Sequence, residues 1–267
     1  MIPKIIHFCW ISGDPYPAKV KKCINSWKKY MPDYKIEIWD KSKCLDLNIP
    51  FINGAINMRK FAFAADLVRC IALYKLGGIY LDSDILLKKN LEPLLKGRFV
   101  GFMEIHKEFD NYGMKILNEK GEVEDILGIG IQAAVLASEK NHPYLKTLID
   151  YYSDKQFNEN TINYFMKFIA PPIFARILVG FGFKYKDEYQ NLDSGIIIYP
   201  SEYIDCNPQS RNRYSFATHL CLGSWRHKLS VKGKIIYVMK RFFYLFLKST
   251  KCDKFIFPVN YKKILHK

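Results

Sequence analysis

The feature that most restricts the fold of this chain is a short apolar segment that ends in two acids, at residues 77–84 (GGIYLDSD). Two glycines interrupt the apolar pattern before it, and residues 79–81 have the composition of a buried strand. Asp82 and Asp84 follow at once, where unpaired charges would be costly beside apolar neighbours. Two carboxylates one residue apart can face one point on extended chain, which predicts a site for Mn²⁺ or Mg²⁺. Solvated acids, or acids paired with basic residues, are the alternative.

Strands and helices alternate along most of the sequence. We expect strands at residues 4–9, 35–39, 79–81, 99–103, 196–199 and 216–220, and helices from 17, over 56–76, from 143 to 152 and over 170–179. This alternation predicts an α/β sheet with parallel strands, in which ligands bind at the carboxyl ends of strands. The acidic turn stands at such an end. Residues 104–126 are expected to form a polar surface insertion.

The helix expected before the acidic turn carries two charges on an otherwise apolar surface. Asp66 and Arg69 are three residues apart and share one face, and Arg59 lies near the same stripe. An intrahelical ion pair is one interpretation. The other is a pair that binds a ribose hydroxyl and a phosphate or sugar oxygen.

Most of the net charge of +15 lies near the C-terminus, since residues 228–267 contain eleven Lys and Arg and one acid, Asp253. This contrast predicts a catalytic domain over 1–227 and a basic amphipathic helical tail over 228–267. The apolar run of the tail is interrupted by Lys240-Arg241, so it is too short to span a bilayer. It is typical of a helix that lies on an anionic membrane surface. Packing of the tail on the core is the alternative.

The seven cysteines are scattered and form no CxxC pair, which argues against a disulfide framework and a cysteine zinc site. A reducing compartment is expected, and the N-terminus lacks the pattern of a signal peptide. Together with the tail, these features predict a cytoplasmic protein, peripheral on the inner face of the membrane. The tail aromatics lie among aliphatic residues, which argues against nucleic acid as a partner.

Residues 59–85 (RKFAFAADLVRCIALYKLGGIYLDSDI) resemble the signature of glycosyltransferase family 32. That family includes bacterial capsular sugar transferases and yeast-type α-mannosyltransferases, and it is similar to the catalytic domains of large clostridial glucosylating toxins. The opening IPKIIHFCW and the segment 219–225 (HLCLGSW) resemble its first and last motifs. The resemblance implies a GT-A type α/β fold, a Rossmann-like mixed sheet flanked by helices. It also implies a retaining mechanism and a divalent metal, usually manganese.

The resemblance further implies roles for single residues around a nucleotide-sugar. Trp10 matches the aromatic position near the donor base, and Asp66 and Arg69 match the residues that contact ribose and sugar. Asp82 and Asp84 match the metal motif, with Asp84 as the expected direct ligand.

The remaining expected donor contacts come from the metal motif, the closing motif and one irregular segment. Ser83 stands between the two metal-motif acids. Ser224 and Trp225 match the loop that covers the diphosphate, where Trp225 would donate to a leaving-group oxygen. His219 is either a further metal ligand or an ordinary strand histidine. Residues 128–132 depart from the family pattern, and Gln132 is the candidate for contact with the sugar.

These observations predict an enzyme that transfers a hexose from a nucleoside-diphosphate sugar to a hydroxyl of a glycan or lipid-linked glycan. The expected donor is a UDP-sugar, with a GDP-sugar as the other possibility, and the expected role is synthesis of surface polysaccharide or oligosaccharide. A metal-dependent phosphoester hydrolase is an alternative, but it needs further ligands, and His106 and His142 are dispersed. A basic nucleotide- or nucleic-acid-binding module without enzymatic activity is the other alternative.

Overall fold

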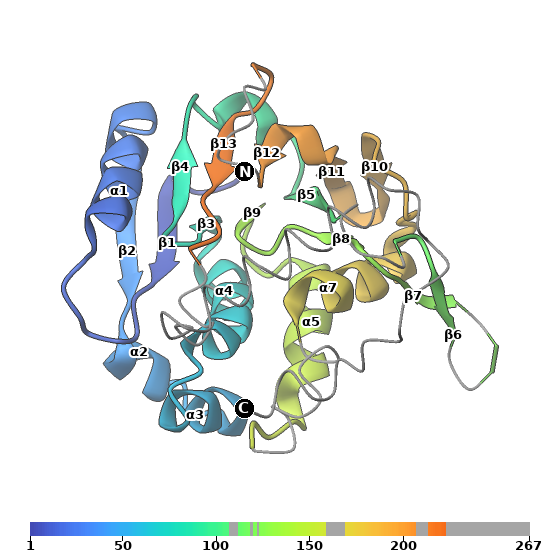
Figure 1. Cartoon of the computed structure of the whole chain (residues 1–267), viewed down its shortest axis with the longest axis horizontal. Coiled ribbons are helices and arrows are strands. Elements are labelled where there is room, and N and C mark those ends of the chain that lie inside the picture. Colours follow the sequence, from blue (N-terminus) through green and yellow to red (C-terminus); the bar gives the residue numbers. More distant parts are fainter. Residues whose placement is uncertain (107–111, 118–119, 122, 159–168, 207–212, 223–267) are drawn as a thin grey trace, which may run out of the picture. The chain divides into compact units, whose positions relative to one another are not determined.

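An eight-stranded sheet forms the centre of the described part of the chain, residues 1–106, 112–117, 120–121, 123–158, 169–206 and 213–222. In this computed structural model the strands follow the order β10 (Gln190–Leu192), β11 (Ile196–Tyr199), β5 (Phe99–Ile105), β9 (Val135–Ser138), β3 (Gly78–Leu81), β1 (Ile5–Cys9) and β2 (Lys35–Trp39). The eighth strand, β8 (Ile129–Ile131), pairs with β5 (Figure 1).

The strand directions determine which residues meet at one edge of this sheet. β1 is parallel to β2 and to β3, and β5 is parallel to β11. β9 is antiparallel to both β3 and β5, so β3 and β5 run in the same direction. The expected mixed sheet with parallel members is confirmed. The carboxyl ends of β1, β2, β3 and β5 therefore lie at one edge, where ligands of α/β proteins bind.

Helices cover both faces of the sheet, as the GT-A expectation requires. The helices are α1 (Ala18–Tyr30), α2 (Lys41–Leu45), α3 (Pro50–Asn57), α4 (Phe61–Leu76), α5 (Pro143–Ser153) and α7 (Ala170–Leu178). Side chains of β3 alternate between the two faces. Tyr80 packs into one core with α3, α4, α5 and α7, whereas Ile79 and Leu81 pack into another with Trp27 of α1. Short 3₁₀ turns occur at Glu92–Leu94, Val179–Phe181, Asp193–Gly195 and Ser201–Tyr203.

A three-stranded sheet brings a late part of the chain to the acidic turn. It has the order β12 (Ile204–Asp205), β13 (Ala217–His219) and β4 (Ile85–Leu87), and β4 begins directly after Asp84. β13 is antiparallel to β4, with His219 opposite Ile85. A separate hairpin consists of β6 (Lys115–Leu117) and β7 (Val123–Ile126). The register of β13 thus places residue 219 beside residue 84.

The predicted single helix over 56–76 is wrong at its start. The structure has two helices there, α3 and α4, separated by a turn in which Arg59 has φ +56°. Asn57, Arg59 and Lys60 interrupt the apolar pattern, and α3 and α4 pack against each other across the turn. Arg59 is exposed and lies outside α4, so it does not continue the stripe of Asp66 and Arg69.

The predicted surface insertion over 104–126 also starts too early. β5 continues to Ile105 because β8 pairs with it, with Glu104 opposite Gly130. The Glu104 side chain is only 11% exposed. The insertion interpretation fits the β6–β7 hairpin, whose strand β6 is exposed at all three positions. Glu104, near the end of β5, therefore lies at the edge of the sheet and not in the surface insertion.

Gly77 and Gly78, at the junction of α4 and β3, position the strand that leads to the acidic turn. Gly77 caps α4, and its carbonyl accepts a hydrogen bond from the buried His7, with Nε2 at 2.8 Å. Trp39 Nε1 donates to Nδ1 of the same ring, so His7 is neutral and carries its proton on Nε2. Gly78 has φ +110°, and a Cβ there would lie 2.5 Å from the carbonyl oxygen of Ile5. Only glycine fits this close approach of β3 to the backbone of β1.

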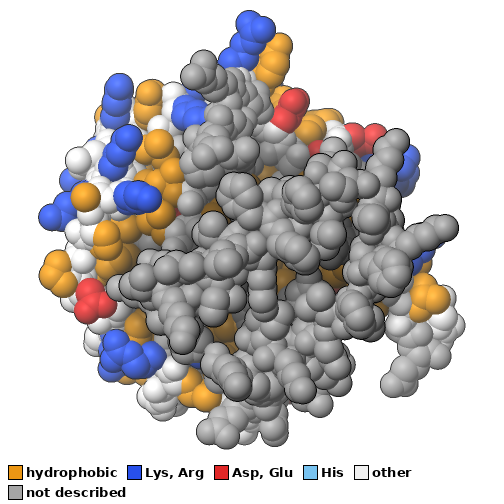
Figure 2. Space-filling model, in the orientation of Figure 1, with side chains coloured by type: hydrophobic (Ala, Val, Ile, Leu, Met, Phe, Trp, Pro, Cys, Tyr) orange, Lys and Arg blue, Asp and Glu red, His pale blue; other side chains and the backbone are white. Residues whose placement is uncertain are grey.

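The exposed face of α1 is cationic. Figure 2 shows Lys and Arg side chains on the side where α1 and β2 lie in Figure 1. The lysines of this helix are all exposed, and within the described residues none forms an ion pair with an acid: Lys19, Lys21, Lys22, Lys28 and Lys29. Among the described helices, none has the length and apolar character that crossing a bilayer requires. The tail over 228–267 lies outside the described residues, so the division at residue 227 stays a prediction.

Replacement of Gly78 by alanine tests the role of the glycine pair. We expect Gly78→Ala to lower the free energy of unfolding by about 2–4 kcal/mol, because backbone strain and a steric clash add together. Urea denaturation gives the value. Gly13→Ala is the matched control, since Gly13 has φ +74° but no atom within 4 Å of its Cβ position. That control is expected to lose about 1 kcal/mol of unfolding free energy. Equal losses in both variants would contradict the steric role of Gly78 against β1.

Candidate active site

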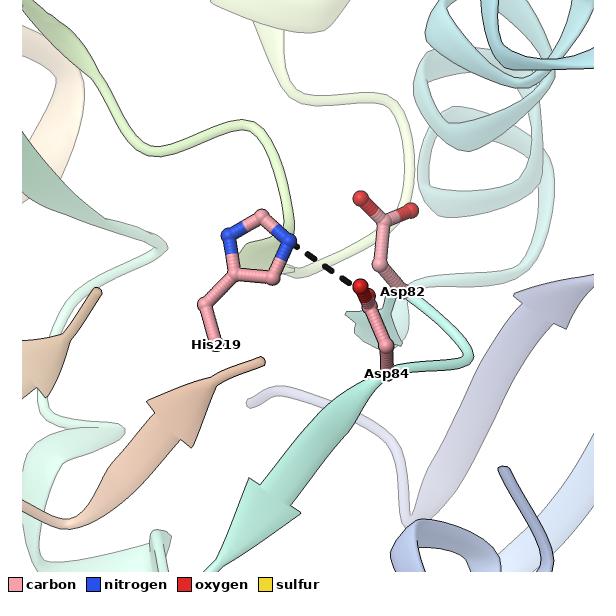
Figure 3. A group of neighbouring side chains, drawn as sticks. All are labelled: Asp82, Asp84 and His219. Atoms are coloured by element: carbon pink, nitrogen blue, oxygen red, sulfur yellow. Dashed lines mark ion pairs between the residues drawn. The ribbon is translucent and has the colours of Figure 1, made fainter. Parts of the chain in front are cut away.

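Asp82 and Asp84 extend from the turn between β3 and β4, at the carboxyl edge of the sheet (Figure 3). Asp82 Oδ1 accepts a hydrogen bond from the Tyr80 hydroxyl at 2.9 Å, and its backbone amide donates to Ala134. Asp84 is held on its other side by the segment after β13. The Leu222 amide donates to Asp84 Oδ2 at 2.8 Å, and the Leu220 amide donates to the Asp84 carbonyl. The Asp84 carboxylate is therefore fixed by a backbone amide from a distant part of the chain, whereas the Asp82 carboxylate is held by the nearby Tyr80 side chain.

His219 completes a group of three metal-ligating side chains. Its Nε2 lies 3.4 Å from Asp84 Oδ1, and one ligand atom from each of Asp82, Asp84 and His219 lies within 4.8 Å of the other two (Figure 3). The ring of His219 faces the turn from β13, whereas both acids come from the β3–β4 connection. The structure brings His219 close enough to both acids to share one ion with them, and its role as a metal ligand stays a prediction.

His219 and Asp84 each shift the pKa of the other toward its charged form. Burial alone would raise the pKa of Asp84, but the hydrogen bond and charge of His219, together with the Leu222 amide, hold the pKa below its usual value. Burial alone would lower the pKa of the His219 imidazole, but Asp84 and Cys221 outweigh it and raise this pKa well above the usual value. An ion pair of imidazolium and carboxylate is thus the stable form of these two residues by themselves.

The three side chains also have the chemistry of a divalent-metal site. Two carboxylates and one imidazole suit Mn²⁺, and carboxylates suit Mg²⁺. His219 Nδ1 is buried, and Cys221 beside the ring contributes with Asp84 to the raised pKa of the imidazole. The donor set fits a divalent cation that leaves further positions for a phosphate ligand.

Arg69 connects the helix charges to the acidic turn. Its Nη2 lies 2.8 Å from Asp66 Oδ1 and 3.5 Å from Asp82 Oδ1. Nε donates to the Ala65 carbonyl at 3.1 Å, Nη1 donates to the Ala133 carbonyl, and the guanidinium stacks over the Tyr80 ring. The side chain is 4% exposed. The structure thus shows the intrahelical ion pair and its contact with Asp82, while the binding of a ribose or sugar oxygen by this pair stays a prediction.

Asp66 is the more exposed member of this pair. Burial raises the pKa of its carboxyl to about 7, against the opposing effect of Arg69. Its side chain is 14% exposed, while most of the Arg69 N–H groups point at the protein itself. Of the two, Asp66 therefore has more surface for a ligand.

The other expected donor contacts lie at different places around this edge. Trp10 directly follows β1, is half-buried, stacks edge-on against Tyr16 and donates from Nε1 to the Asp14 carbonyl. Ser83 lies in the turn between the two acids and is half-buried. Ser224 and Trp225 lie outside the described residues. The structure therefore brings together Asp66, Arg69, Asp82, Asp84 and His219, with Trp10 at the end of a neighbouring strand.

Gln132 lies deeper than a sugar-contacting residue needs to. It is 1% exposed, its Nε2 donates to Cys206 Sγ at 3.0 Å, and its Oε1 accepts from the Ala134 amide. Its proposed contact with the sugar stays a prediction, and both ends of its amide already have protein partners.

Two features near the site were missed from the sequence. One is Glu104, which follows the apolar run 99–103 just as Asp82 follows 79–81. The other is the contact of Cys206 with Cys221. This contact and His219 lower the pKa of the Cys221 thiol to about 5, against the opposing effect of burial. The repeated pattern of a strand followed by an acid could have identified Glu104, whereas no local signal relates Cys206 to Cys221.

Part of this chain is similar to a described family of known proteins. Residues 17–100 match the family described as "Glycosyltransferase sugar-binding region containing DXD motif". An uncharacterized glycosyltransferase of Acanthamoeba polyphaga mimivirus is 31% identical over 119 residues, which are 42% of this chain and 47% of that protein. Inositol phosphoceramide mannosyltransferase 3 of Schizosaccharomyces pombe is 35% identical over 101 residues, 35% of this chain and 27% of that protein. The chain spans less than half the length of these relatives.

Solved structures of glycosyltransferases also align with this chain. The PaToxG glycosyltransferase is 20% identical with a TM-score of 0.44, and covers 67% of this chain and 69% of its own. The galactosyltransferase LgtC is 16% identical with a TM-score of 0.38, and covers 81% of this chain and 87% of its own. The matched residues 17–100 contain α4, β3 and the Asp82–Asp84 turn. The similarity to the sugar-binding family thus covers the central part of the candidate site.

Proposed function

We propose that this protein is a metal-dependent glycosyltransferase that moves a hexose from a nucleoside-diphosphate sugar to a hydroxyl of a glycan. The observation that carries the proposal is the convergence of Asp82, Asp84 and His219 at the carboxyl edge of the sheet, within 4.8 Å of one another. Asp82 and Asp84 lie inside the region that matches the sugar-binding family, and His219 comes from outside it. An additional ligand supplied from a distant strand supports a built metal site.

The protein's own groups would position the donor in this reaction. Asp82, Asp84 and His219 would hold a divalent ion, which when bound neutralises the charge of a diphosphate leaving group. Arg69 keeps Asp82 and Asp66 in place, and Asp66 has the accessible carboxyl for a ribose or sugar hydroxyl. Trp10 offers an aromatic ring at the neighbouring strand end for a nucleobase. Such fixed groups stabilise developing charge without reorganisation during the reaction.

The finer parts of the proposal concern the substrates and the stereochemistry. We propose a UDP-hexose as the donor and retention of configuration, in keeping with the family resemblance of residues 59–85. The proposed acceptor is a glycan or lipid-linked glycan used for a surface polysaccharide or oligosaccharide. The Ser224-Trp225 segment would cover the diphosphate and exclude water, which limits hydrolysis of the donor.

A thermal-shift panel tests the donor site. We expect one nucleotide among UDP, GDP and their hexose conjugates to stabilise the protein when Mn²⁺ is present, because ligands that bind only the folded state raise its stability. The gain is about 2.7 kcal/mol when the ligand is at a hundred times its Kd. Asp84→Ala is expected to abolish the shift.

The control for that panel is Asp150→Ala, which removes an exposed acid paired with Lys146 on α5. This variant is expected to keep the nucleotide shift. No shift with any nucleotide, from folded wild-type protein, would overturn the glycosyltransferase proposal and favour the non-enzymatic module. Release of free phosphate or nucleotide without sugar transfer to any acceptor would instead favour the phosphoester hydrolase.

The charge state of His219 predicts a pH dependence of metal affinity. The raised pKa keeps His219 protonated at neutral pH, and an imidazole must lose that proton to become a metal ligand. The affinity for Mn²⁺ is therefore expected to rise with pH until the pKa of His219 is passed. Calorimetry in buffers of different ionisation enthalpy counts the protons released. We expect about one proton per ion in the wild type and fewer in His219→Asn, and equal proton release in both proteins would argue against His219 as a ligand.

We further propose a cytoplasmic location on the inner face of an anionic membrane, mediated by residues 228–267. Each Lys or Arg near such a surface contributes about 1 kcal/mol. Reversal of two charges in Lys240→Glu/Arg241→Glu should therefore weaken binding to phosphatidylserine vesicles at least about tenfold. Co-sedimentation measures it. Lys21→Glu/Lys28→Glu makes the same charge change on exposed α1, and an equal loss there would show that net charge, not the tail, causes binding.

A further inference from the structure

Glu104 is a buried acid at the same edge of the sheet as the metal motif. It lies near the carboxyl end of β5, and β5 runs in the direction of β3, which leads to Asp82. Its side chain is 11% exposed. In agreement with this position, the Glu104 charge contributes to a higher pKa of Asp66 and of Cys206. Glu104 therefore belongs to the site, although no motif assigns it there.

The two carboxylate oxygens of Glu104 have different surroundings. Oε1 lies 2.8 Å from His106 Nε2. An ionised carboxylate only accepts hydrogen bonds, so this nitrogen carries a proton and donates. Oε2 is buried and has no hydrogen-bond partner within the described part of the chain. The His106 contact thus fixes the carboxylate by one oxygen and leaves the other without a donor.

The nearby side chain of Gln132 does not donate a hydrogen bond to Glu104 Oε2. Gln132 lies close to Glu104, since the backbone amide of Gln132 donates to the carbonyl of Phe102, which precedes Glu104 by two residues on β5. Its side-chain Nε2, however, donates to Cys206. A buried acceptor without a donor destabilises a folded protein, so such an atom calls for a specific explanation. A ligand that brings a hydroxyl or amide donor supplies one.

We infer that Glu104 Oε2 accepts a hydrogen bond from a hydroxyl of the transferred hexose, which makes Glu104 a further catalytic residue of this site. The inference rests on the proposed function. A hexose attached to a diphosphate at the Asp82–Asp84 turn lies at this edge of the sheet, and every sugar hydroxyl can donate. Asp66, whose pKa the Glu104 charge helps to raise, is one of the residues expected to contact the donor sugar.

The test separates the nucleotide part of the donor from its sugar. The full chain with Mn²⁺ is titrated by calorimetry with the nucleoside diphosphate and with its hexose conjugate that stabilise the wild type in the panel above. Glu104→Gln is isosteric, and with its carbonyl oxygen toward His106 it turns an NH₂ donor to the place of Oε2. We expect its Kd for the nucleoside diphosphate to stay within about twofold of wild type. Its Kd for the nucleotide-sugar and its transfer rate should worsen about ten- to a hundredfold, as for a hydrogen bond to a charged group.

Two further variants keep the test decisive. Glu92→Gln removes an exposed acid paired with Lys4 and is expected to behave as wild type in both titrations. Glu104→Asp keeps the charge but withdraws it by one methylene, and it serves where circular dichroism shows that Glu104→Gln does not fold. It too should lose affinity for the nucleotide-sugar alone.

The outcomes distinguish this inference from the proposed function. Glu104 variants that bind and turn over the nucleotide-sugar as wild type does would overturn the role of Glu104 and leave the glycosyltransferase proposal intact. An equal loss of affinity for the nucleoside diphosphate would also overturn it, because the effect would then not concern the sugar. A wild-type protein that binds no nucleotide would overturn both.

Discussion

A single buried guanidinium holds the site together. Arg69 on α4 contacts the carboxylate of Asp66, the carboxylate of Asp82, the Tyr80 ring and the backbone carbonyl of Ala133. It thereby ties a helix, the strand β3 and the connection between β8 and β9 to one point. Removal of one partner of a buried ion pair costs about 3–5 kcal/mol, because the other charge is left without compensation. The arrangement of the acidic side chains at this sheet edge therefore depends on the Arg69 charge, although the Arg69 side chain is only 4% exposed.

The ion pair of Asp84 and His219 can lose its positive charge, unlike the pairs of Arg69. Asp84 is paired with His219, and the pair is stable as an ion pair because each residue shifts the pKa of the other toward its charged form. Unlike Arg69, an imidazolium can give up its proton when a metal arrives. The site therefore combines a fixed cation that orients Asp82 with a replaceable one beside Asp84. This difference would suit the proposed centre, in which a metal and a diphosphate bind and leave while the protein framework stays constant.

The sequence was a good guide wherever the signal was local. The strand 79–81, the acidic turn and the helix that begins after Pro17 all form as expected, because glycine, proline and apolar periodicity act within a few residues. The helix over 56–76 was predicted too long, since periodicity does not register a turn that lets two apolar helices pack on each other. The sequence left His219 open between a further metal ligand and an ordinary strand histidine, so its position beside Asp84 was not predicted. It depends on the pairing of β13 with β4, which joins residues far apart in the chain.

Glu104 shows where such local reasoning ends. Asp82 and Glu104 have the same local setting, an apolar strand followed by an acid, yet only Asp82 was assigned to the site because a second acid follows two residues later. The polar residues after Glu104 resembled a surface loop. What decides its environment is the pairing of β5 with β8 and β9, since β9 reverses direction between β3 and β5 and so brings both acids to one edge. In a mixed sheet, the meaning of an acid at a strand end is therefore set by the direction of its neighbours, which local pattern does not contain.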